Sequence, residues 1–219
     1  GIRAWCWQRL HPSEPLPAVV PSTKAAIVAE LKAQLREVQA RGAVDGEMPR
    51  VMIMGALGRC GRGAKECADS VGLRTIDWDM EETKAGGPFP AILDADIFVN
   101  CILLSGRTAP FLTSELIREH PQRKLSVISD VSCDPNSEYN PIPVYDRITS
   151  WEAPTLELEA APRLQLISID NLPSVLALEA SLAFGDRLLP LLLDFPHSKC
   201  WAHSASIFRE RLALLDREA

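Results

Sequence analysis

The chain has 219 residues, 47% of them hydrophobic and 24% charged, and its formal net charge is −6. This length and apolar content can bury the core of one main domain, whereas no stretch approaches the roughly 20 consecutive apolar residues of a membrane span. Positive and negative residues are mixed along the chain without basic runs, which argues against nucleic acid and a membrane surface as partners. We see no leader in which charged residues precede an apolar stretch, so secretion has no support from the sequence.

The predicted elements alternate between helices and strands. Ser22 is expected to cap a first helix that runs to about residue 41, where Gly42 follows. Short apolar runs bounded by polar residues predict strands buried on both faces, as in a parallel sheet. The strands are expected at about 50–55, 74–79, 96–101, 125–130 and 164–170, with a helix at about 58–71 after the first of them.

The second half of the chain predicts a long loop and two helices. Residues 133–145 are rich in Pro and Asn, and a loop of this length in a compact domain is more often functional than idle. The helices are expected at about 173–189 and 201–216, separated by Pro190 and Pro196.

The whole pattern predicts an α/β fold with a Rossmann-like, doubly wound, mostly parallel sheet and flanking N- and C-terminal helices. We expect a connector and helix over residues 1–48, a dinucleotide-binding domain over 49–190, and a C-terminal helical segment over 191–219.

Three glycines follow the first predicted strand. Gly55, Gly58 and Gly61 would let a pyrophosphate and the sheet approach the backbone, and a helix beginning near Gly58 would offer unpaired N–H groups to phosphates. The spacing G-x-x-G-x-x-G differs from G-x-G-x-x-G, so a plain strand–turn–helix with glycines for close packing remains the alternative. Asp79 ends the next apolar stretch, where an acid contacts the adenosine ribose hydroxyls and repels a 2′-phosphate. The combination predicts a dinucleotide site that favours NAD over NADP.

Several segments together resemble one known family, the fungal-type, NAD-dependent, lysine-forming saccharopine dehydrogenases. The resemblance rests on the order and spacing of 55–61, 78–83, 86–89, 100–101, 130–132, 140–143 and 167–174, and it extends from Gly1 to near Ala219. In that family the cofactor domain is the second of two, and nothing in this chain resembles the first. The first domain supplies a lysine and a histidine for acid–base chemistry and most substrate contacts, so the resemblance implies a fragment, a cleaved form or a shortened relative.

The resemblance also implies a set of site residues. Gly58 and Arg59 match the positions that contact the diphosphate, Asp79 and Thr83 those that contact the ribose, and Val131 and Ser132 those near the nicotinamide and substrate. The remaining implied cofactor contacts are Gly55, Gly61, Leu103, Ile169, Asp170, Asn171 and Leu172.

Each of three polar residues in this set has a structural alternative. Arg59 could be a surface arginine on the first helical turn, and Ser132 could satisfy its own turn. Asp170 is the candidate catalytic acid, but it could instead cap the helix expected near Pro173.

Two positions depart from the family pattern. Leu103 stands where the family tends to carry an aromatic residue near the cofactor, which predicts weaker cofactor binding. Asn171 stands where the family usually has histidine, and an amide cannot exchange a proton near neutral pH.

The cysteines and histidines do not predict a metal site. The six cysteines contain no Cys-x-x-Cys pair, and we expect reduced thiols in a cytosolic protein. His197, Cys200 and His203 form H-x-x-C-x-x-H, but a fourth ligand is missing and the histidines would lie on different faces.

Three functions remain open from the sequence. The chain could be the NAD half of an oxidoreductase that oxidises the secondary amine of saccharopine to an imine, which water splits to lysine and 2-oxoglutarate. It could instead be a shortened relative with another, non-redox reaction on a small molecule, or a cofactor-binding partner protein without catalysis. The intact glycine pattern and Asp79 favour the first, whereas Leu103 and Asn171 favour the second.

Apolar residues on the first and last predicted helices predict association. If no other part of the chain covers them, a homodimer or a partner chain would have to do so; alternatively, the two helices pack on each other. The residues concerned are Leu31, Leu35 and Val38 on one helix and Ile207, Phe208, Leu212 and Leu215 on the other.

Overall fold

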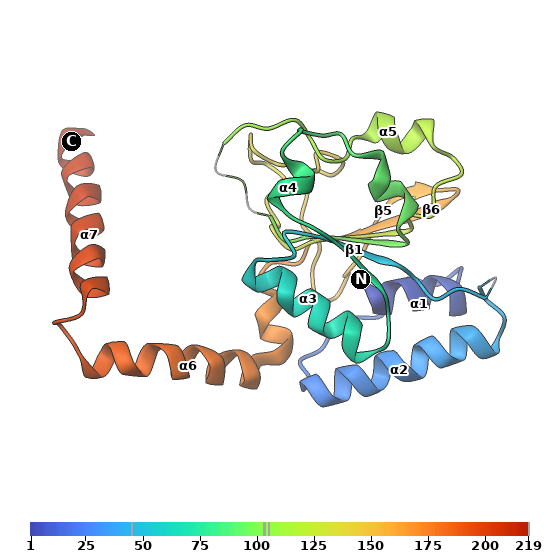
Figure 1. The fold of residues 1–219 in the computed structure, drawn as a ribbon, viewed down its shortest axis with the longest axis horizontal. Coiled ribbons are helices and arrows are strands. Elements are labelled where there is room, and N and C mark those ends of the chain that lie inside the picture. Colours follow the sequence, from blue (N-terminus) through green and yellow to red (C-terminus); the bar gives the residue numbers. More distant parts are fainter. Residues whose placement is uncertain (45, 103, 105, 219) are drawn as a thin grey trace. The chain divides into compact units, whose positions relative to one another are not determined.

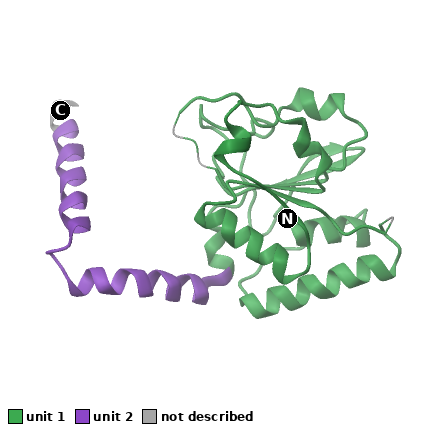
Figure 2. Cartoon of the chain, viewed as in Figure 1, with its two compact units in different colours: residues 1–175 green, residues 176–219 purple. Residues whose placement is uncertain are grey.

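The computed structural model describes residues 1–44, 46–102, 104 and 106–218. The chain forms two compact units, residues 1–175 and 176–219, shown in green and purple in Figure 2. The boundary between the compact units falls after Val175. The domain boundaries expected from the sequence, after residues 48 and 190, stay a prediction. Each unit is described by itself below.

Unit 1 is built on a six-stranded sheet with strand order β2-β1-β3-β4-β6-β5. Five strands are parallel, and β5 pairs antiparallel with β6 at one edge. The strands are β1 Val51–Met54, β2 Thr75–Trp78, β3 Ile97–Asn100, β4 Val127–Asp130, β5 Leu156–Ala160 and β6 Arg163–Ile167. The predicted α/β fold with a mostly parallel sheet is thus confirmed.

The central strands are short because each is an apolar run that ends on a polar or glycine position. All four residues of β1, β3 and β4 are buried, as strands covered on both faces must be. The sequence analysis missed β5, whose five residues are exposed or half-buried. Its burial is that of an edge strand, which lacks the continuous apolar run used to find the others.

One face of the sheet is covered by three helices, α1 (Ile2–Leu10), α2 (Lys24–Ala40) and α3 (Arg59–Ser70), as Figure 1 shows. The sequence analysis missed α1, because its buried side chains do not form one simple stripe: Ala4, Trp5, Cys6, Gln8 and Leu10 are all buried. The cap of α2 is Thr23 rather than Ser22, and its hydroxyl oxygen accepts from the amide of Ala26 at 3.2 Å.

The apolar face of α2 is covered within unit 1. Leu31, Leu35 and Val38 are buried, and the last two belong to the core that also contains Trp5 of α1. This corrects the expectation that α2 needs cover from another chain or from the last helix.

The other face carries short helices. They are α4 (Met80–Thr83), the 3-10 helix η1 (Pro90–Asp94) and α5 (Ser114–Glu119). Ile92, Leu116 and Ile117 from these elements pack in a second core with Phe98 of β3 and Ile128 of β4. Helices thus lie on both faces of the sheet.

Unit 2 contains two longer helices, α6 (Ala177–Leu193) and α7 (Lys199–Glu218). The first begins later than predicted because Leu172–Leu176 form a 3-10 helix, η2. Pro190 lies inside α6, so it does not separate the two helices as expected. Its missing N–H removes one helical hydrogen bond to the preceding turn, and α6 ends three residues later, at Leu193. None of the described helices is long and apolar enough to cross a membrane.

Candidate functional site

The candidate residues of unit 1 gather at the carboxyl ends of the parallel strands. Gly55 follows β1, Asp79 follows β2, Asn100 ends β3, Asp130 ends β4 and Asp170 lies beyond β6. β1 connects to β2 on one side, while β3 lies on its other side, so the strand order reverses between β1 and β3. In open α/β sheets, ligands bind outside the strand ends at such a reversal.

The glycine loop leaves no room for side chains. A Cβ on Gly61 would lie 2.1 Å from the carbonyl oxygen of Gly55, and one on Gly55 would lie 2.9 Å from Cγ1 of Ile102. Gly55 also has φ +85°, which a residue with a side chain adopts at a cost. The glycines therefore bring the first turn of α3 directly against the end of β1.

The N-terminus of α3 is open to a ligand. Gly58 is its N-cap and supplies no side-chain cap, so the first amides of the helix lack the partner that a serine or aspartate would give. The amide of Gly58 itself donates to the carbonyl of Gly55 at 3.1 Å, which tightens the loop. Arrays of unpaired amides at a helix N-terminus bind phosphate oxygens.

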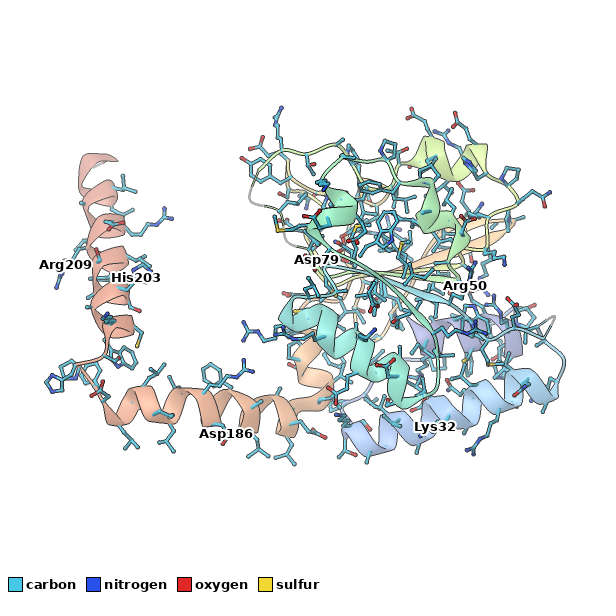
Figure 3. The ribbon with its side chains drawn as sticks, in the orientation of Figure 1. Lys32, Arg50, Asp79, Asp186, His203 and Arg209 are labelled. Atoms are coloured by element: carbon cyan, nitrogen blue, oxygen red, sulfur yellow. The ribbon has the colours of Figure 1, made fainter. Side chains whose placement is uncertain are left out.

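Asp79 links β2 to the glycine loop. Its Oδ2 accepts from the amide of Leu57 at 2.8 Å and its Oδ1 accepts from the amide of Met80 at 3.0 Å. The Thr83 hydroxyl donates to the Asp79 carbonyl at 2.8 Å. The carboxylate, labelled in Figure 3, is half-buried at the end of β2. It also accepts from the amide of Glu82 in a capping box, so three backbone amides bind it and about one lone-pair site remains for a hydroxyl donor.

Two arginines flank this loop. Arg59 is exposed at the first position of α3, as its match to a diphosphate-contacting position requires. Arg62, which the sequence analysis did not select, donates from Nη1 to the carbonyl of Leu57 at 2.9 Å. Leu103 lies outside the described residues.

A buried polar network joins the ends of β3 and β4. Asp130 is 1% exposed, and its Oδ1 accepts from Asn100 Nδ2 at 3.0 Å and from the Ser132 hydroxyl at 2.6 Å. Its Oδ2 accepts from the Tyr145 hydroxyl at 2.6 Å, and Ser168 donates in turn to Tyr145 at 3.2 Å. The Ser132 hydroxyl is thus committed to a turn at the strand end, which is the structural role that the sequence analysis left open for it.

Burial sets the proton affinities in this region. Burial, followed by the hydrogen bond to Asp130, raises the pKa of Tyr145 above its ordinary value, so the phenol stays a neutral donor. Burial also raises the pKa of the Cys101 thiol to about 12, and the nearby Cys60 and Asp130 add to the effect. Cys101 is therefore a thiol and not a nucleophilic thiolate at neutral pH.

The sequence analysis selected Ser132 and Val131 but missed Asn100, Asp130, Tyr145 and Ser168 as site residues. Asn100 and Asp130 each close a run of buried apolar residues, and that polar ending was the available signal. Tyr145 and Ser168 carry no comparable signal, because only the fold brings them to Asp130.

The segment after β6 forms a turn at Asp170. Ile169 is buried, Leu172 is half-buried, and Asp170 is exposed with its Oδ1 accepting from the amide of Asn171 at 2.8 Å. Asn171 has φ +51°, and Cys133 at the end of β4 has φ +53°. These are left-handed conformations that non-glycine residues adopt mainly in constrained places. Asp170 holds its own turn rather than a cap of η2.

The predicted residues thus fall into groups along one sheet edge. Gly55, Gly58, Arg59, Gly61, Asp79 and Thr83 lie at the ends of β1 and β2, Val131 and Ser132 at the end of β4, and 169–172 beyond β6. His197, Cys200 and His203 belong to unit 2; Figure 3 labels His203 on α7. Within the part of the chain that is described, no group of three His, Cys, Asp or Glu residues is arranged to hold a metal.

Comparison with known proteins gives a consistent picture. The family model described as "Alanine dehydrogenase/PNT, C-terminal domain" matches residues 89–214, which is more than half of the chain. Saccharopine dehydrogenase [NAD(+), L-lysine-forming] of Yarrowia lipolytica is 44% identical over 218 residues, covering 95% of this chain and 58% of that protein. The protein of the same name from Neurospora crassa is 41% identical, covering 100% of this chain and 60% of its own length.

A more distant match is alanine dehydrogenase of Methanococcus maripaludis, 33% identical over 48% of this chain and 26% of that protein. The resemblance to saccharopine dehydrogenase indicated by the sequence segments is confirmed by the closer matches. The chain spans about three fifths of the length of those relatives, 58% and 60% for the two above.

Proposed function

Because the chain belongs to the family of the alanine dehydrogenase/PNT C-terminal domain, we propose that its strand-end crevice binds NAD(H). We further propose that the chain is the cofactor-binding part of a saccharopine dehydrogenase-like oxidoreductase that acts on the C–N bond of a secondary amine or imine. The names of the relatives, which include NAD(+), support this proposal.

The observation that carries the proposal is the close approach of α3 to the end of β1 at Gly61. No atom larger than hydrogen fits between α3 and β1, since a Cβ there would lie 2.1 Å from the Gly55 oxygen. This close approach leaves the uncapped start of α3 beside the strand end, where a diphosphate can reach its amides. Gly58 and Arg59 would hold the diphosphate, and Asp79 would hold the adenosine ribose. The bound cofactor would supply a hydride acceptor.

The substrate side of the crevice lies toward β4 and β6. Asp170 is the acid that we propose for handling a proton there, since its carboxylate is exposed beyond β6. Asn171 beside it has no group that can act as an acid or a base near neutral pH. Further acid–base groups would come from outside the described residues.

Asp79 provides the test of the proposal. Binding of NADH and NADPH can be measured by fluorescence titration for the wild type, Asp79→Asn and Asp77→Asn. Asp77 is the matched control, because it lies on β2 two residues before Asp79 and pairs with Lys65 instead of the glycine loop. We expect a preference for NADH that Asp79→Asn reduces and Asp77→Asn retains. Equal or tighter binding of NADPH by the wild type, or no binding of either, would refute the proposal.

A second candidate function is a redox-free reaction on a small molecule. Asn171 favours it, because this residue replaces the histidine implied by the family resemblance and lies in a left-handed turn beside Asp170. Binding of a small molecule without any affinity for NADH would support this alternative over the first.

We also propose that unit 2 associates with a second copy of the chain. One face of α7 carries apolar residues at alternating steps of four and three residues. They are Trp201, Ala205, Phe208, Leu212 and Leu215, of which the last three are exposed. That spacing forms the apolar seam of paired helices. A partner chain in place of the second copy is the competing outcome. We propose a cytosolic protein, which is supported by all six cysteines being free.

A further inference from the structure

Asp130 is a buried acid whose bonding partners are all neutral. It receives hydrogen bonds from the Asn100 amide, the Ser132 amide and hydroxyl, and the Tyr145 hydroxyl. Each of these groups donates a hydrogen bond to a carboxyl oxygen. Such partners fit the ionised form of Asp130, because a carboxylate only accepts hydrogen bonds. Within the described residues, no cationic side chain forms an ion pair with it.

The negative charge of Asp130 therefore remains uncompensated. Neutral donors stabilise a carboxylate locally but leave its net charge in place, and a group that is 1% exposed has little water to screen it. Its field extends from the end of β4 into whatever occupies the crevice beside it.

The topology places this charge on one side of the proposed cofactor site. Asp79 lies at the end of β2, whereas β3 and β4 lie on the opposite side of β1. A dinucleotide that crosses the strand reversal with its adenosine on Asp79 therefore extends its nicotinamide half toward β3 and β4. This step rests on the proposed function, namely NAD(H) binding in the crevice.

Only one redox state of the cofactor carries a positive ring. The nicotinamide ring of NAD⁺ is cationic, and it becomes neutral when it accepts a hydride, so attraction to Asp130 exists in the oxidised state and disappears in the reduced one. We propose that Asp130 is a specificity-determining residue that makes the crevice favour NAD⁺ relative to NADH.

Asp130→Asn removes this charge with little change in bonding. The new amide oxygen can accept from Asn100 and Ser132, as Oδ1 does now. The new amide nitrogen can donate to the Tyr145 oxygen if the Tyr145 hydroxyl rotates to donate to Ser168, reversing the present direction of that bond. Asp134→Asn is the matched control, because Asp134 is an exposed acid near Cys133, and water screens its charge.

The experiment measures dissociation constants of NAD⁺, NADH and ADP-ribose by calorimetry for the wild type and both variants, with thermal melts to establish folding. Asp130→Asn is expected to weaken NAD⁺ binding on the order of tenfold and to leave NADH and ADP-ribose within about twofold. Asp134→Asn is expected to change the ratio of NAD⁺ to NADH affinity by less than about twofold.

A second measurement needs no variant. Benzamide adenine dinucleotide has the shape of NAD⁺ with an uncharged ring, and the wild type should bind NAD⁺ on the order of tenfold more tightly than this analogue. Equal affinities, or an Asp130→Asn variant that folds and keeps the wild-type ratio of NAD⁺ to NADH, would overturn the role of Asp130 while leaving NAD(H) binding intact. A wild type that binds none of these dinucleotides would instead refute the proposed function.

Discussion

Replacing Gly61 by alanine should damage the crevice, whereas the same change two residues later should not. At Gly61 the added Cβ would lie 2.1 Å from the Gly55 oxygen, which is 0.9 Å short of the 3.0 Å that real Cβ atoms keep. The next contacts, at 2.7 Å, are also backbone atoms, so no side chain can rotate away and α3 must move relative to β1. At Gly63, on the same helix, no atom lies within 4 Å of an added Cβ.

The difference in stability between the two variants measures the effect of the clash, because both replace a helical glycine by alanine. Overpacking of this kind costs about 1–3 kcal/mol. Gly63→Ala alone should stabilise by up to about 1 kcal/mol. Since about 1 kcal/mol shifts the melting temperature of a domain of this size by roughly 2–4 °C, Gly61→Ala should melt several degrees below Gly63→Ala.

Cofactor affinity gives the second readout of this pair. Displacing the start of α3 should weaken NADH binding by about tenfold or more in Gly61→Ala, while Gly63→Ala keeps wild-type affinity. Thermal melts and NADH titrations of both variants test the reasoning. A Gly61→Ala protein with the stability and NADH affinity of Gly63→Ala would show that α3 does not press on β1 as described.

Three further predictions concern the cofactor, the reaction and association. Arg59→Ala should weaken NADH and NADPH alike by roughly tenfold in calorimetry, because the guanidinium would contact the diphosphate that both share; an effect on only one of them would argue against that position. The 219-residue chain alone should not oxidise saccharopine at a useful rate when NADH absorbance is followed, because acid–base catalysis contributes about 10²–10⁴-fold and Asn171 cannot exchange a proton; robust turnover would be the contrary result. Light scattering should show a dimer that dissociates in Leu212→Asp, since a charge in an apolar seam is costly; a wild-type monomer at high concentration would exclude the dimer.

The sequence revealed those features that depend on local pattern. The runs that became β1, β3 and β4 are continuously apolar because both faces of the sheet are covered, and the glycines after β1 mark the place where α3 approaches the strand. The helix α1 was missed because its buried side chains form no clear stripe. The edge strand β5 was missed because it alternates apolar and polar residues and lacks the continuous apolar run used to find the other strands.

The buried network shows why part of the site could not be found from local pattern. Tyr145 lies 15 positions after Asp130 in the sequence, and Ser168 lies 23 positions after Tyr145. Such contacts depend on how the 133–145 loop returns to the sheet, which no periodicity encodes. Ser132 was found from the sequence, and its hydroxyl donates to Asp130, whereas its contact with a substrate stays a prediction.

The location of the cofactor is tested most directly by amide hydrogen exchange with and without saturating NADH. We expect slower exchange in the amides of residues 56–62 and 79–83, where the glycine loop, the start of α3 and the capped turn after β2 meet. NADH binding with no added protection in these two segments, or with protection only in unit 2, would contradict a cofactor site at the ends of β1 and β2.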